Sequence, residues 1–95
     1  MTLGGRAFTL RPSFAAIVTV EERLGSVISL ALKASKGELG LCEATALLWE
    51  TLDQRTAMSE EELGGLILQE GVAAVAPAVS ALLAAILRGS RHAEP

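Results

Sequence analysis

The sequence predicts a mainly α-helical fold, a small bundle of about five short helices preceded by a short N-terminal strand or β-hairpin. Alanine and leucine supply 16 residues each, against 6 valines and 4 isoleucines, so helix formers outnumber β-branched strand formers. Serine and glycine recur where such helices would begin and end. The 95 residues leave room for one compact domain. We expect this domain over residues 1–88 and a disordered tail over residues 89–95.

The first element is expected at about residues 3–11. A Gly4-Gly5 pair offers a tight turn, and Phe8 and Leu10 alternate with the polar Thr9 at the period of a half-buried strand. A short hairpin or a single strand fits this pattern.

Two helices should follow. Ser13 can cap a helix that runs from Phe14 to Gly25, and Ser26 can start a second helix that stops at Gly37. Helical spacing places a core-facing stripe on each. In the first helix the stripe is Phe14, Ile17, Val18 and Leu24, and in the second it is Val27, Leu30, Ala31 and Ala34.

The third helix is expected to run to about Arg55, with Leu41, Ala44, Leu48 and Leu52 as its apolar stripe. Ser59 and Glu62 then form the sequence pattern of a capping box, and Glu60 and Glu61 add negative charge to the first turn. A fourth helix should therefore begin near Glu60 and close before Gly71. Its three glutamates are interpreted as parts of the helix start and not as a cation site.

The last helix should start near Ala73 or Ala74, which leaves Pro77 in or near the first turn. Its apolar face is broad and comprises Val75, Val79, Leu82, Leu83, Ile86 and Leu87. This face exceeds what we expect a 95-residue monomer to cover, so self-association or partner docking should follow.

Charge and length argue against two classes of partner. The net charge is −3 without a basic cluster, which gives no support for binding nucleic acid or anionic lipid. The apolar run from Val72 to Leu87 is too short for a hydrocarbon core of roughly 30 Å, so membrane insertion is disfavoured.

Cys42 has no second cysteine to pair with, and we expect it to be buried in a reducing compartment. No secretory signal begins the chain, so a cytoplasmic protein is expected.

No motif supports catalysis, a metal or another cofactor. Cys42 and His92 are the available nucleophile and base, but nothing in the sequence holds His92 near Cys42. A metal site needs three or four ligands at defined spacing, which the chain does not present. The glycine pairs lack the further glycines and the lysine of a phosphate-binding loop.

Five residues are candidates for contact with a protein partner. They are Phe8, Leu10, Trp49, Leu83 and Leu87. Trp49 is either an interface anchor or a core residue. The residues before Gly4 are too few to pair with all of residues 6–11, so part of a strand edge around Phe8 and Leu10 can accept a strand from a second chain or be solvated by water.

The order of these elements resembles a known family. The Gly4-Gly5 turn, Phe8 to Leu10, the run from Arg11 to Phe14, Glu21 or Glu22 before Leu24-Gly25, and a close at Glu70-Gly71 are similar to small tail proteins of gene transfer agents and related tailed phages of alphaproteobacteria. These proteins are labelled tail assembly chaperone or tail tube protein. The resemblance extends from Gly4 to about Leu87.

The resemblance implies a non-enzymatic protein–protein interaction module in the assembly of a phage-like tail, as assembly chaperone or minor tail component. Its partners would be other tail proteins, and it would be cytoplasmic or incorporated into the particle. Two alternatives stay open. One is an adaptor or regulatory domain that dimerises through Val72 to Leu87, and the other is a small enzyme that uses Cys42.

Overall fold

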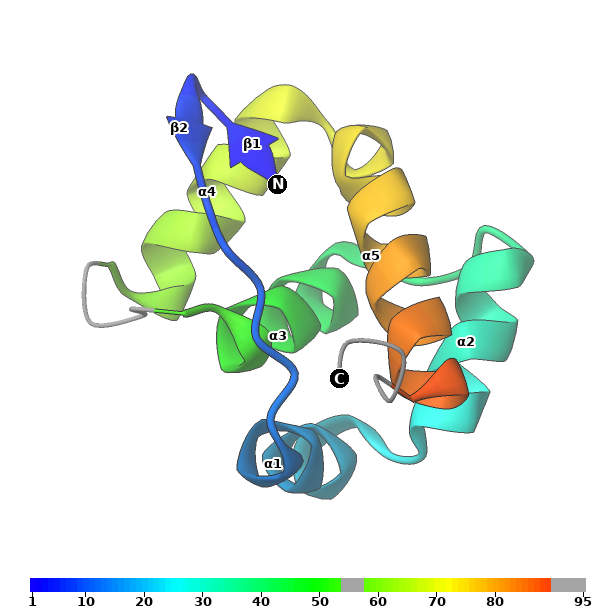
Figure 1. Ribbon diagram of the computed structural model, residues 1–95. Coiled ribbons are helices and arrows are strands. Elements are labelled where there is room, and N and C mark those ends of the chain that lie inside the picture. Colours follow the sequence, from blue (N-terminus) through cyan, green and yellow to red (C-terminus); the bar gives the residue numbers. More distant parts are fainter. Residues whose placement is uncertain (54–57, 90–95) are drawn as a thin grey trace.

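Five helices and one β-hairpin make up the part of the chain that the computed structural model describes, residues 1–53 and 58–89 (Figure 1). The elements are β1 (Thr2–Leu3), β2 (Arg6–Ala7), α1 (Phe14–Leu24), α2 (Val27–Ser35), α3 (Leu41–Thr51), α4 (Glu60–Glu70) and α5 (Val72–Arg88). The predicted mainly helical fold with an N-terminal hairpin is confirmed. The third helix ends at Thr51, earlier than expected, and Arg55 lies outside the described residues, as does the expected tail after Gly89.

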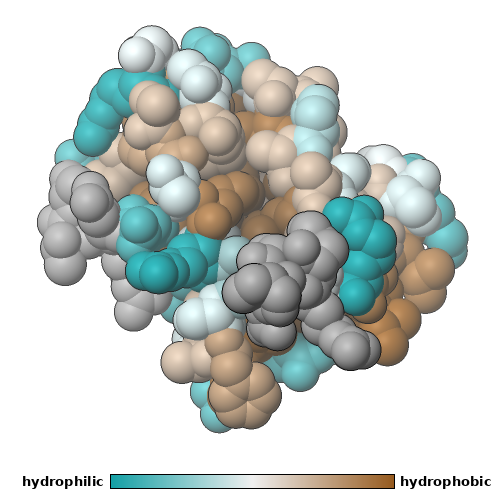
Figure 2. Space-filling model, viewed as in Figure 1, coloured by the Kyte–Doolittle hydropathy of each residue, from teal (hydrophilic) through white to brown (hydrophobic). Residues whose placement is uncertain are grey.

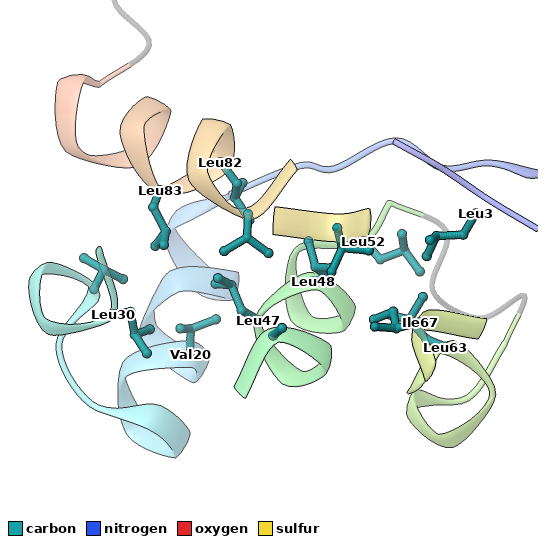
Figure 3. Close-up of a cluster of buried hydrophobic side chains, with 14 of the residues drawn as sticks. Leu3, Val20, Leu30, Leu47, Leu48, Leu52, Leu63, Ile67, Leu82 and Leu83 are labelled. Atoms are coloured by element: carbon teal, nitrogen blue, oxygen red, sulfur yellow. The ribbon is translucent and has the colours of Figure 1, made fainter. Parts of the chain in front are cut away.

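Helix α3 is the centre of the fold and packs against α1, α4 and α5. It is buried nearly all round, because Ala44 to Leu48 form an unbroken run of buried residues, whereas a helix on the surface buries one stripe. Side chains from every other helix and from β1 surround it (Figure 3). Those less than 2% exposed include Leu3, Val20, Leu30, Leu63, Ile67 and Val75. Helix α2 packs mainly on α5 and also contacts α1.

The N-terminal hairpin turns at Gly4 and Gly5. Their φ angles are 56° and 79°, and two consecutive positive φ values define the tight turn whose twist suits an antiparallel hairpin. Thr2 pairs with Ala7, and Leu3 pairs with Arg6. Leu3 points into the core beside α4 and is 1% exposed, and Met1 and Phe8 pack against the same core, so these side chains hold the hairpin to the bundle.

The expected free strand edge at Phe8 is wrong. The Phe8 amide donates a hydrogen bond to the Met1 carbonyl over 2.6 Å, and the N-terminal ammonium donates to the Phe8 carbonyl over 3.0 Å. Leu10 then forms an isolated antiparallel bridge with Leu52. The partner of Leu10 is the extended chain that follows α3, a pairing that no local sequence pattern indicates. We therefore expect the Phe8 amide to be protected from hydrogen exchange in the isolated chain.

The stripe of α1 that was expected to face the core is wrong, because it is rotated about the helix axis from the stripe that does. Phe14 is 86% exposed and Val18 is 38% exposed, whereas Val20 is fully buried. The stripe that packs on the core consists of Ile17, Val20 and Leu24. At about 100° per residue, Phe14 and Val18 lie to one side of that stripe.

Two further expectations from the sequence are corrected. Cys42 is exposed and not buried, because it lies on the solvent side of the first turn of α3. Helix α5 begins at Val72, directly after Gly71, so Pro77 lies in the second turn and not the first. Pro77 and Ala73 are both exposed, which leaves the Ala73 carbonyl accessible to water where proline provides no amide hydrogen.

The capping box of α4 is confirmed. The Ser59 hydroxyl accepts a hydrogen bond from the Glu62 amide over 3.1 Å, and the Glu62 carboxylate accepts one from the Ser59 amide over 2.9 Å. Ser59→Ala removes one of these bonds, so we expect it to lower the free energy of unfolding by about 1 kcal/mol in urea denaturation. Ser29→Ala, at an exposed position inside α2, is the matched control and should cause no loss. An unchanged midpoint for Ser59→Ala would contradict the capping role.

The same cap predicts a pH dependence. The hydrogen bond from the Ser59 amide, and then the one with the Ser59 side chain, lower the pKa of Glu62 from its ordinary value. A lowered pKa in the folded state means stabilisation that is present above the unfolded-state pKa and is lost as the pH falls through the folded-state pKa. Wild type should therefore be more stable than Glu62→Gln at neutral pH, and the two should converge in acid. A difference that stays constant down to acid pH would contradict this.

Candidate interaction surface

The five candidate contact residues lie in three different environments. Leu83 is 2% exposed and points from α5 toward the side chains of α2 and α3 (Figure 3). Its burial within the chain removes it from the candidate surface. Phe8, Leu10 and Trp49 are half-buried and pack against the core, and the Trp49 indole donates to the Met58 carbonyl over 3.3 Å. Leu87 is 50% exposed.

The apolar face of α5 is mostly covered by the chain itself. Val75, Val79, Leu82 and Leu83 are all buried by the neighbouring helices. The expectation that these residues exceed what one chain can cover is wrong for this part of the face. Only its end, at Leu87, stays open to solvent among the large apolar residues of α5 that the structure describes.

Helix α2 carries two large apolar side chains that face solvent. Ile28 is 61% exposed and Leu32 is 58% exposed, and their i, i+4 spacing places them on one side of the helix. Helix α2 packs on α5, so these two residues and Leu87 lie on neighbouring helices. Figure 2 shows apolar side chains gathered at this edge, over α2. We call Ile28, Leu32 and Leu87 the α2–α5 face.

Three basic residues lie on or at the end of α2 and α5, in a chain whose net charge is negative. Helices α2 and α5 contain Lys33 and Arg88, and Lys36 is the C-cap of α2. Acidic residues flank α2, because Glu21 accepts a hydrogen bond from the Val27 amide at its start and Glu38 follows its end. Lys33 pairs with Glu43 over 2.6 Å, whereas Lys36 and Arg88 make no ion pair with another described residue. The face therefore combines apolar area with available positive charge.

A groove lies where the end of α2 meets the start of α5. Its volume is about 290 Å³, and its lining is mostly small and apolar, including Ala34, Leu39, Ala73 and Ala76. The helices run in opposite directions there, as Figure 1 shows, so Leu87 lies toward the other end of the pair. The groove and the α2–α5 face thus place two accessible apolar regions on this helix pair.

A polar cluster around Arg23 joins three helices. Arg23 of α1 donates to Glu50 of α3 over 2.8 Å, and to the two carboxylate oxygens of Glu60 of α4 over 3.0 and 2.9 Å. The hydrogen bonds with Glu60, and then with Glu50, raise the pKa of Arg23 above its ordinary value. Sequence reasoning placed Glu60 in the helix start and missed this cluster, since its members are far apart in the chain.

The described residues offer neither a histidine beside Cys42 nor a metal site. Cys42 is exposed, and its suggested base His92 lies outside the described part of the chain. Within residues 1–53 and 58–89, no group of three or more histidine, cysteine or acidic side chains is arranged to hold a metal ion.

The described helices also include none that could cross a bilayer alone. Helices α4 and α5 reach the required length and apolarity only when combined, and their axes are bent by 117° at the junction.

Comparison with known proteins places the chain in a family. The sequence profile of a family described as phage tail tube protein, GTA-gp10, matches residues 1–89. The chain belongs to this family. The match includes the hairpin, all five described helices and the α2–α5 face. The resemblance to tail proteins of gene transfer agents is thereby confirmed. Comparison with curated proteins and with solved structures gives no match.

Membership of this tail family implies contact with other phage tail components. The sequence interpretation had already singled out Leu87, but it missed Ile28 and Leu32. A signal for them was present: once Val27, Leu30, Ala31 and Ala34 are assigned to the core, two large apolar residues remain on the opposite side of the same helix.

Proposed function

We propose that this protein is a non-enzymatic interaction module that binds another tail protein during assembly of a phage-like tail, through the α2–α5 face. The observation that carries the proposal is the exposure of Ile28, Leu32 and Leu87 on two helices packed against each other. Each large aliphatic side chain gains roughly 1.5–3 kcal/mol when it is fully buried. A partner that covers this face therefore supplies a substantial driving force.

The cations Lys36 and Arg88 favour a particular kind of partner. Lys36 and Arg88 would attract acidic side chains beside an apolar segment, which adds specificity and speeds association. An amphipathic helix with acidic flanks has this chemistry, and docking of such a helix on an apolar surface is a common mode of recognition.

Two roles are compatible with this binding. As an assembly chaperone, the protein would cover an apolar region of a tail protein and leave before the tail is complete. As a minor tail component, it would remain. Probing purified particles for the chain separates the two roles, because only a component is retained.

The test of the proposal is affinity capture from cells that produce tail particles, with captured proteins identified by mass spectrometry. Wild type is expected to recover a tail protein of the same particle, and Leu32→Asn should reduce its recovery at least about tenfold. Phe14→Asn is the matched control, since Phe14 is the most exposed large apolar residue but lies on α1. It should capture as wild type does.

Equal recovery of the tail protein by Leu32→Asn and wild type would overturn the role of the α2–α5 face. Recovery of only further copies of this chain, with no tail protein, would favour a dimerising adaptor domain instead.

A further inference from the structure

Helix α4 has two adjacent glycines in its interior, Gly64 and Gly65. An interior glycine weakens a helix relative to alanine, because its unfolded backbone has more freedom to lose. Gly64 has a packing role, since a Cβ there would lie 3.4 Å from Thr45 Cγ2 of α3. A Cβ at Gly65 would meet no described atom within 4 Å, so an alanine would fit. The glycine at position 65 therefore weakens α4 without improving its packing.

The α3 side of the same contact buries a hydroxyl without a hydrogen bond. Thr45 is 6% exposed, and its Oγ1 has no hydrogen-bond partner among the residues that the structure describes. This oxygen would lie 3.7 Å from a Cβ at Gly64, so it faces α4. Burial of a hydroxyl without a compensating hydrogen bond is unfavourable. Packing of α4 on α3 removes the Thr45 hydroxyl from water, and separation of the two helices returns it to water.

The other four helices remain connected to one another without α4. Helix α3 packs on α1 and α5, and α2 packs on α5 and contacts α1. A single residue, Gly71, separates α4 from α5, and the two helix axes are bent by 117° there. Helix α5 can therefore stay on α2 and α3 when α4 moves, with the change in backbone direction absorbed at Gly71.

We infer that α4 is a hinged flap, which opens as one unit while α1, α2, α3 and α5 stay folded. Opening uncovers Leu63 and Ile67, which are both 0% exposed in the closed chain. It leaves the α2–α5 face intact, so this property is independent of the proposed function. A low-stability element of this kind regulates access to the surface it covers, since a ligand for that surface binds only the open state.

Arg23 is the latch of the flap. Its guanidinium donates to both carboxylate oxygens of Glu60, over 3.0 and 2.9 Å, and these bonds must break on opening. The Arg23 and Glu60 side chains are 39% and 33% exposed, so water competes for the contact. The hydrogen bond from Arg23 to Glu50 joins α1 to α3, so it can persist when α4 leaves and keeps the guanidinium paired in the open state.

The test is hydrogen exchange of the full isolated chain, followed for single amides by NMR in urea below the unfolding transition. The amides of Leu66, Ile67 and Leu68 lie inside α4. Opening as one unit gives them the same protection and the same urea dependence, although Ile67 is buried and Leu68 is 65% exposed. Amides of α3 and α5, such as those of Leu47 and Leu82, should be at least about tenfold more protected. Equal protection of α3, α4 and α5 would overturn the inference.

Ala81→Gly separates opening of α4 from unfolding of the whole chain. Ala81 is an exposed residue inside α5, which stays folded when the flap opens. The variant should speed the exchange of amides in α3 about fourfold and leave the exchange of amides in α4 unchanged. An equal acceleration in α3 and α4 would show that α4 exchanges only when the whole chain unfolds, and would exclude the flap.

Thr45→Val and Gly65→Ala test the two features that favour opening. Valine has the shape of threonine without the hydroxyl, so Thr45→Val should slow the exchange of α4 at least about fivefold, although position 45 lies in α3. Gly65→Ala should slow it about fourfold. Ser29→Ala, at an exposed position inside α2, is the control and should leave the exchange of α4 unchanged. Unchanged or faster exchange of α4 in Thr45→Val would contradict the inference.

Glu60→Gln tests the latch and should speed the exchange of α4 about threefold. Glu61→Gln is the matched control, because Glu61 also lies in the first turn of α4 but makes no ion pair with a described cation. It should have the smaller effect, since only its interaction with the helix dipole is lost. Equal effects of the two variants would show that Arg23 does not hold the flap closed.

Discussion

Replacing Leu83 by glutamate is expected to unfold the domain. Leu83 is 2% exposed and lies among side chains of α2 and α3, including Leu30 and Leu47 (Figure 3). Removal of a buried leucine costs roughly 2–5 kcal/mol, and a carboxylate without a partner at this position adds several more. A domain of this size has about 5–15 kcal/mol of stability in total. Far-ultraviolet circular dichroism and urea denaturation should show a chain without a cooperative transition.

Leu87→Glu is the matched control one turn further along α5. Leu87 is 50% exposed, so its replacement should change the free energy of unfolding by only about 0.5 kcal/mol. The pair of variants also separates core from interface on the last helix. A folded Leu83→Glu chain with a wild-type urea midpoint would show that Leu83 is not a core residue, and would restore it to the candidate surface.

Helix ends could be predicted from the sequence because their chemistry is local. Ser13 accepts a hydrogen bond from the Ala16 amide, and Ser59 accepts one from the Glu62 amide, each three residues away. Such contacts need no tertiary structure, so a short sequence pattern is enough to indicate them. The order of the elements follows from these starts and from the glycines that end the helices.

The orientation of α1 could not be predicted, for a physical reason. Phe14, Ile17, Val18, Val20 and Leu24 cover nearly half of its circumference, so two overlapping stripes compete for the core. Contact with α3 decides between them. The pairing of Leu10 with Leu52 is likewise tertiary, since it depends on where the chain leaves α3.

The candidate surface was accessible from the sequence only in part. Leu87 was indicated by its place at the end of a long apolar run. The signal for Ile28 and Leu32 was not specific, because apolar residues on two sides of a short helix also fit a fully buried helix.

Arg23→Ala is expected to lower the free energy of unfolding by about 2 kcal/mol. The variant removes the guanidinium that joins α1 to Glu50, whose side chain is 6% exposed, and to Glu60. Loss of one partner of a fully buried ion pair costs roughly 3–5 kcal/mol, and the 39% exposure of the Arg23 side chain reduces that figure. Because the pKa of Arg23 is raised, its contribution is fully present below the unfolded-state pKa, so the loss should persist through neutral and mildly alkaline pH.

Two controls make the Arg23 measurement specific. Arg11→Ala removes an arginine that is 75% exposed and lies 3.9 Å from Asp53, so it should cost no more than about 0.5 kcal/mol. Arg23→Ala combined with Glu50→Gln should be less destabilised than the two single losses added together, because the second change removes a charge that the first leaves without its guanidinium. Strict additivity in this cycle, or an Arg23→Ala midpoint equal to that of Arg11→Ala, would show that the cluster does not hold α1, α3 and α4 together.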